Sequence, residues 1–202
     1  RKNMTATSES EVGDAHEAGL VAAFPGGFPE DEAPATPEET REEFLSRSRS
    51  GYTKVRHAFV QSAGQGSGGS QPALLPMCSR NHRAAVLYLA VLANWPWLSQ
   101  EAEPLPADAW IRFLSCDSSS GLTWTPQSLS HAWGVLEALR LVARPRHGRL
   151  KLALPLREDG NGEPYTAPKG KGDPYLVVPN EFWIRQLHAT LSWPALAVLL
   201  IL

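Results

Sequence analysis

The sequence has few cysteines, no long apolar run and no signal peptide. Cys78 and Cys116 are its only cysteines, and they lack the CxxC spacing or neighbouring histidines of a zinc site and are too few for a disulfide framework. No stretch reaches the ~18 apolar residues of a membrane span. The first residues lack the basic and apolar regions of a signal peptide. We therefore expect a cytoplasmic protein with reduced thiols, no bound metal and no membrane partner.

The motifs of the common enzyme classes are missing as well. The sequence contains no HExxH, GxSxG or Walker loop, and no pairing of a cysteine with a histidine that suggests a nucleophile. Glu158, Asp159 and Glu163 fall in a stretch expected to be a loop, which is a poor place to hold the metal ions of a nuclease. The glycines of residues 63–70 follow no GxGxxG spacing and indicate a linker. We expect no enzyme activity, no catalytic residues and no cofactor.

Charge divides the sequence into an acidic first part and a basic remainder. Residues 1–44 contain three basic and eleven acidic side chains, a net charge of −8, whereas residues 45–202 carry +6 of the overall −2. The acidic part has little Leu, Ile or aromatic content, so it cannot bury enough apolar surface to offset the entropy lost on ordering. We predict a disordered acidic segment at residues 1–50. An acidic segment beside a basic domain is typical of nucleic-acid-binding proteins.

Three helices and a hairpin are predicted in the middle of the sequence. Apolar residues recur at helical spacing over 81–98, where Pro96 is the expected stop, and over 106–114. A third helix begins with the capping residue Thr125 followed by proline, and is expected to run to about Val142. Two strands then flank a turn at Gly148, which is expected to adopt a positive φ.

This order of elements resembles that of winged helix-turn-helix proteins. The resemblance rests on the stretch from Thr125 to Leu129, which matches the start of a recognition helix, and on the stretch from Leu136 to Arg144, which matches the entry to a basic wing. The resemblance implies a mainly α fold with a small β-hairpin. It also implies binding to double-stranded DNA and the capacity to form a homodimer. Residues 174–202 are similar to the opening of a second winged-helix unit. A tandem pair would resemble plasmid replication initiators and actinobacterial mobile-element proteins.

The sequence is thus divided into five parts: a disordered segment at 1–50, an extended arm and Gly/Ser linker at 51–79, a winged-helix DNA-binding domain at 80–156, a loop or linker at 157–173, and the start of a second winged-helix domain at 174–202. The expected function is sequence-specific DNA binding in transcription regulation, or in replication or partition of a plasmid or mobile element.

The residues expected to contact DNA come from the third helix and the hairpin. A recognition helix places the residues of its first turns against base edges in the major groove, and closely spaced cations on a wing suit phosphates. The predicted DNA-binding residues are Thr125, Gln127, Ser128 and His131 on the helix and Arg144, Arg146, His147, Arg149 and Lys151 on the hairpin.

Two other interpretations remain open for these residues. The hairpin charges would also suit a solvated strand edge that resists pairing with other chains. The same fold serves in some proteins as a protein-interaction module that does not bind DNA. The apolar stripe of Leu129, Trp133, Leu136 and Leu139 is expected to be core. DNA binding requires the hairpin cations to lie on the same surface as Gln127 and His131.

Overall fold

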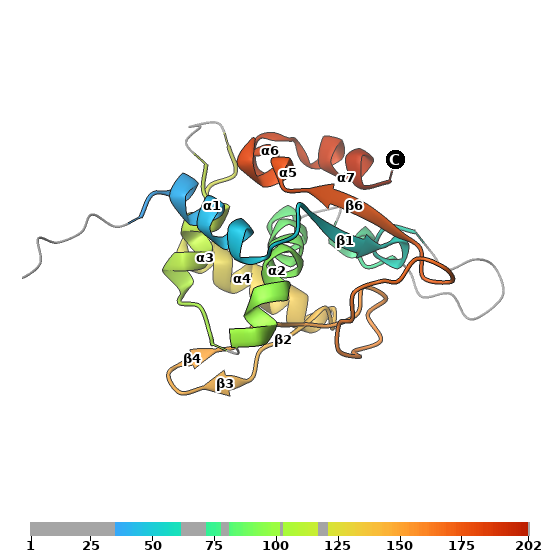
Figure 1. Ribbon diagram of the computed structural model, residues 1–202, viewed down its shortest axis with the longest axis horizontal. Coiled ribbons are helices and arrows are strands. Elements are labelled where there is room, and N and C mark those ends of the chain that lie inside the picture. The colour runs from blue at the N-terminus through green and yellow to red at the C-terminus, as the bar shows by residue number, and fades with distance from the viewer. Residues whose placement is uncertain (1–34, 62–71, 78–80, 102, 117–120, 202) are drawn as a thin grey trace, which may run out of the picture. The chain divides into compact units, whose positions relative to one another are not determined.

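Helix α2 (His82–Glu101) lies at the centre of the structure, with α1 (Pro37–Arg47) and α4 (Pro126–Ala138) packed against it (Figure 1). The computed structural model describes residues 35–61, 72–77, 81–101, 103–116 and 121–201. Every α2 residue from Ala84 to Asn94 is buried, as expected for a helix that is apolar on all sides. About half of the described residues are helical and the strands form small antiparallel pairs. This confirms the mainly α class with a small hairpin.

Helix α2 continues through Pro96, contrary to the prediction that this proline would end it. The ring removes one backbone N–H and disfavours the preceding helical turn, yet Trp97 and Leu98 beyond it are buried. Asn94 accepts a hydrogen bond from the Trp97 indole at 3.2 Å, and the Gln100 amide donates to the Pro96 carbonyl at 2.7 Å. Burial and these local bonds sustain the last turn.

Helix α1 (Pro37–Arg47) corrects the prediction that residues 1–50 are disordered, for the part that the structure describes. Thr36 and Glu39 form a capping box around its start, and Phe44 and Leu45 are buried. Phe44 packs against Trp97 and Phe113, with ring centroids 5.3 and 5.8 Å apart. A few buried residues suffice because α2 and α3 supply most of the apolar surface. Residues 1–34 and the predicted linker at 63–70 lie outside the described residues.

Strand β1 (Tyr52–Arg56) pairs antiparallel with β6 (Tyr175–Pro179), in the register Tyr52↔Pro179 to Arg56↔Tyr175. The short 3-10 turns η1 (His57–Phe59) and η2 (Leu75–Met77) follow β1 in the chain. The predicted arm is therefore part of a sheet. Strand β6 was expected to open a separate winged-helix unit, but residues 35–202 form one compact unit, so the predicted boundary at residue 174 does not separate two domains.

Residues 157–173, predicted to be a free loop or linker, are tied to β1 by a buried charge network. Arg56, 3% exposed, pairs with the fully buried Glu158 at 2.7 Å and with Asp173 at 2.8 Å. The Tyr165 hydroxyl donates to the Lys54 carbonyl at 3.1 Å. Burial raises the pKa of Glu158, while its hydrogen bonds from Arg56 oppose that rise. The polar composition of this stretch thus reflects an internal ion pair as well as exposure.

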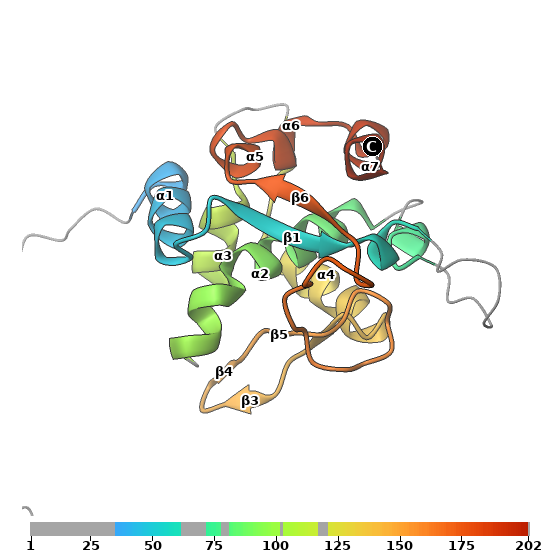
Figure 2. The same cartoon turned by 45° about the vertical axis from the view of Figure 1, so that its right-hand side comes forward.

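The C-terminal residues fold back over β6 as three helices: α5 (Glu181–Ile184), α6 (Leu187–Thr190) and α7 (Trp193–Ile201). The sequence predicted one helix from Asn180 to Leu191, but Gln186 adopts a left-handed conformation with φ 57° that separates α5 from α6. The strand before them and the final helix were predicted correctly. In both views β6 lies between β1 and these helices (Figures 1 and 2). No helix in the described part of the chain is long and apolar enough to cross a membrane.

Helices α3 (Ala107–Leu114) and α4 (Pro126–Ala138) pack against each other, and α4 also packs on α2. Their starts agree with the sequence prediction, but α4 ends four residues before Val142. The strands that follow are β2 (Val142–Ala143), β3 (Arg146–His147), β4 (Leu150–Lys151) and β5 (Leu154–Pro155).

Candidate nucleic-acid interface

The start of α4 is fixed by a reciprocal pair of hydroxyl hydrogen bonds. The Thr125 hydroxyl accepts from the Ser128 N–H at 3.1 Å, and the Ser128 hydroxyl accepts from the Thr125 N–H at 2.8 Å. Pro126 occupies the first turn, where a missing N–H costs nothing. Both hydroxyls are therefore engaged in holding the helix end. Their predicted contact with DNA stays a prediction.

Helix α4 has one buried and one exposed face. Leu129, Ala132, Trp133 and Leu136 are buried, as the sequence predicted for the apolar stripe, although Leu139 is only partly covered. The exposed residues recur at intervals of three and four, so they form one stripe along the helix. In the first turns of the helix this α4 stripe consists of Gln127, Ser130, His131 and Gly134, and the same exposed face continues to Glu137 and Ala138 in the last turn. The structure thus brings Gln127 and His131 together, and adds two neighbours that were not among the predicted site residues.

Gly134 stands out within the α4 stripe because nothing in the protein requires a glycine there. No atom lies within 4 Å of the position that a Cβ would occupy, and a glycine inside a helix costs about 1 kcal/mol relative to alanine. A missing side chain lets another molecule approach the helix backbone closely. Counting on from Gln127 by helical spacing would have identified both Ser130 and Gly134.

The end of α4 turns the chain sharply into the hairpin. The Leu141 N–H donates to the Leu136 carbonyl and the Arg140 N–H to the Glu137 carbonyl, which is the bonding of a Schellman motif. Arg140 takes the left-handed conformation at φ 54° that this motif needs, and Leu141 is fully buried. This turn ends α4 at Ala138, where the apolar sequence alone suggested that the helix would continue.

Strands β2 to β5 form one hairpin with a continuous register. β2 pairs with β5 and β3 with β4, from Val142↔Pro155 to His147↔Leu150. Gly148 at the tip has φ +60°, as predicted. The β3–β4 end extends beyond the helices at the bottom of both views (Figures 1 and 2). The protein thus presents a two-stranded projection immediately after α4.

The projecting end of the hairpin is strongly basic. Arg146, His147, Arg149 and Lys151 are all exposed, and Arg146 lies directly opposite Lys151 in the strand pairing. Like charges in such cross-strand positions repel each other. Within the described ranges, no carboxylate forms a salt bridge with Arg146, Arg149 or Lys151. Among the residues that the structure describes, this repulsion is left uncompensated.

Arg144 differs from the other hairpin cations because it is partly buried at the base of the hairpin. Its guanidinium lies over the Trp133 ring, 4.4 Å from the centroid, and Trp133 in turn meets Trp110 edge-on at 5.5 Å. Burial lowers the pKa of Arg144, and the nearby Glu137 opposes that change. Arg144 therefore joins the hairpin to α4 through a cation–π contact, and its predicted contact with phosphate stays a prediction.

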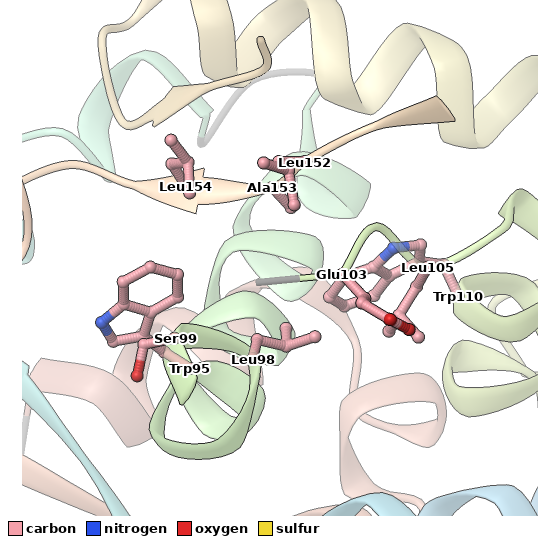
Figure 3. A pocket seen from close by; sticks show the side chains of 9 residues that line it. All are labelled: Trp95, Leu98, Ser99, Glu103, Leu105, Trp110, Leu152, Ala153 and Leu154. Atoms are coloured by element: carbon pink, nitrogen blue, oxygen red, sulfur yellow. The ribbon is translucent and has the colours of Figure 1, made fainter. Parts of the chain in front are cut away.

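The return strand of the hairpin packs against the end of α2 and the segment that leads into α3. Residues 152–154 lie opposite Trp95 and Trp110 across a small cavity of about 70 Å³, and Ala153 packs against the core (Figure 3). Leu105, from the connection between α2 and α3, also lines this cavity. The base of the hairpin is thus set on an aromatic surface, while its tip remains in solvent.

Comparison with family models, with curated proteins and with solved structures found no match to this chain. Among the residues that the structure places, no three His, Cys, Asp or Glu side chains gather in a way that would hold a metal ion. The α4 stripe and the basic hairpin are therefore the features of the protein that bear on its function.

Proposed function

We propose that this protein binds double-stranded DNA through α4 and the basic hairpin, as a non-catalytic winged helix-turn-helix protein. The order of α2, α3, α4 and hairpin is that of this family. DNA binding of this kind serves transcription regulation and the replication or partition of mobile elements.

The observation that carries the proposal is the repulsion at the hairpin tip. Arg146 faces Lys151 without a carboxylate partner in the described structure, and Arg149 lies between them at the turn. DNA phosphates would neutralise these charges and release condensed counterions, which favours binding. A guarded strand edge also carries exposed charges, and the two roles differ in whether reversal of these charges weakens DNA binding.

The remaining residues take distinct roles in this proposal. Gln127 and His131 on the exposed face of α4 read base edges in the major groove, where glutamine pairs with adenine through two hydrogen bonds. Gly134 lets the DNA backbone come close to the helix. Thr125 and Ser128 hold the first turn, and Arg144 fixes the hairpin relative to α4.

The test compares two double charge reversals of equal size. Arg146→Glu with Arg149→Glu changes the hairpin, whereas Lys169→Glu with Lys171→Glu changes exposed lysines of the segment between β5 and β6. Binding of fluorescent duplex DNA is measured by anisotropy at several salt concentrations. We expect the hairpin variant to bind ~10-fold or more weakly, with a salt slope reduced by about 2, because two phosphate contacts are lost. The control variant should retain most of the affinity and the slope.

Equal effects of the two variants would show that binding follows net charge alone and would refute the hairpin interface. Absence of binding by the unaltered protein to any duplex at low salt would refute DNA binding itself. The exposed α4 stripe would then favour the protein-interaction module, which is the second candidate function.

A further inference from the structure

Helix α7 is apolar on all sides, yet only one of its faces is covered. Its nine residues Trp193–Ile201 include no charged side chain, and only Leu196 and Leu200 are buried. Val198, Leu199 and Ile201 are 54%, 49% and 52% exposed. A helix without a polar face is normally buried on all sides, so the outer face of α7 lacks a partner within the described chain.

The exposed face of α7 borders a groove on the outer side of β6. The groove has a volume of about 190 Å³, and its walls come from β6, α5 and α7. Val177 of β6, 49% exposed, and Leu199 of α7 both line it. In the part of the chain that the structure describes, β1 is the only strand that pairs with β6. Val177 and Leu199, together with the exposed Val198 beside Leu199 on α7, are here called the α7 surface.

Two opposite charges stand at the edge of this groove. Glu181 and Arg185 both line it and are both exposed. They are four residues apart on the α5 turn, and among the described residues no salt bridge joins them or engages either one. A surface that carries one negative and one positive group beside an apolar centre is complementary to itself after a two-fold rotation.

We infer that the α7 surface binds a second copy of this chain in a two-fold symmetric dimer. In that arrangement Leu199 and Val198 of each copy cover the apolar groove of the other. Glu181 of each copy faces Arg185 of the other, so the pair forms twice. The apolar centre with a charged rim is the usual composition of a specific interface.

A membrane surface is a poorer occupant of the same site. Helices that lie in a bilayer interface combine an apolar face with a face rich in lysine and arginine. Helix α7 has no cationic residue, and the groove edge contributes one acidic and one basic group. Dimer formation through α5, β6 and α7 does not depend on DNA binding by α4 and the hairpin.

The first experiment measures the mass of the full chain by light scattering over a concentration series of about 1 to 100 µM, the range of moderate protein affinities. We expect the mass to rise from that of the 22.0 kDa monomer to twice that value. Leu199→Glu should weaken the dimer ~10-fold or more, because the charge is placed at an apolar interface centre. Leu75→Glu is the matched control, since Leu75 is 53% exposed, lies on η2 and is not among the residues that line the groove.

The second experiment uses the two charged residues to identify the partner as a second copy. Glu181→Arg alone and Arg185→Glu alone each place like charges opposite each other, so each variant should be largely monomeric. An equimolar mixture of the two variants restores both opposite-charge pairs in a mixed dimer. We therefore expect the mixture to regain the dimer mass, with the unfolding midpoint of each variant unchanged.

Three results would overturn the inference. A monomer throughout the concentration series would show that no second copy binds. A dimer weakened equally by Leu199→Glu and Leu75→Glu would use another surface. A mixture of the two charge variants that stays monomeric, while the unaltered chain forms dimers, would show that Glu181 and Arg185 do not face each other.

Discussion

Acidification should destabilise the protein through His188, a fully buried histidine in α6. Its Nε2 lies 3.2 Å from the Leu114 carbonyl at the end of α3. Burial, together with the positive charge of Arg41, lowers the pKa of His188 from 6.5 to about 4, although the bond to Leu114 opposes this. Unfolding returns the imidazole to water, where it is protonated near pH 6.5.

The magnitude follows from the difference between the two pKa values. The unfolded chain takes up the proton first as pH falls, so the stabilising contribution is complete above pH 6.5 and is lost between pH 6.5 and about 4. The expected loss in the free energy of unfolding is about 1.4 kcal/mol at pH 5.5 and about 3 kcal/mol at pH 4. Urea titrations followed by tryptophan fluorescence at each pH measure this quantity.

The variant His188→Gln isolates the contribution of this side chain. It is expected to be less stable than the unaltered protein at neutral pH, but the difference should shrink by about 3 kcal/mol on going to pH 4. Other groups that titrate in this range, such as His82 and Glu158, do so in both proteins and cancel in the difference. Gln127→Ala, which removes no titratable group from the exposed face of α4, is the control and should show a constant difference. A difference that is independent of pH for His188→Gln as well would refute the assignment of a depressed pKa to this residue.

Four further substitutions probe the core and the proposed interface. Glu158→Leu leaves the buried Arg56 without its main partner and should lower the free energy of unfolding by about 3 to 5 kcal/mol in urea titrations. Leu136→Ala opens a cavity under α4 and should cost about 2 to 5 kcal/mol in the same assay, and no cost would mean that α4 faces the other way. Gly134→Ala should raise stability by about 1 kcal/mol yet weaken binding to duplex DNA in anisotropy titrations. Gln127→Ala should cost about 1 to 3 kcal/mol on a preferred sequence and much less on random duplex, whereas equal losses on both would indicate a phosphate contact.

The elements that local chemistry determines could be predicted from the sequence. Thr125 and Pro126 begin α4 because a hydroxyl cap and a first-turn proline act within a few residues. Helical spacing identified the buried side of α4, and the glycine at 148 identified the hairpin turn. Within the candidate site, the exposure of Gln127, His131 and the hairpin tip follows from the same local rules.

The features that depend on distant partners could not be predicted in this way. Phe44 orders α1 only because α2 and α3 bring Trp97 and Phe113 to it, although the capping box at Thr36 was a usable local signal. Residues 157–173 are polar, so the sequence gives no sign that Glu158 is buried. Glu158 is buried because it pairs with Arg56, which is itself buried. The contact of Arg144 with Trp133 depends on the angle at which the hairpin leaves α4, which the sequence does not specify.

The pairing of β1 with β6 gives the protein a definite order of assembly. Glu158 lies 102 residues after Arg56, and β6 follows it in the chain. At ~5 to 20 residues per second of synthesis, Arg56 is made about 5 to 20 s before Glu158, the residue with which it pairs in the folded protein. The segments that form α2 to α4 and the hairpin have been made by then, whereas β1 must wait for β6, which is made later. We therefore expect the β1–β6 pair to close only after the helices and the hairpin between its two strands have been made.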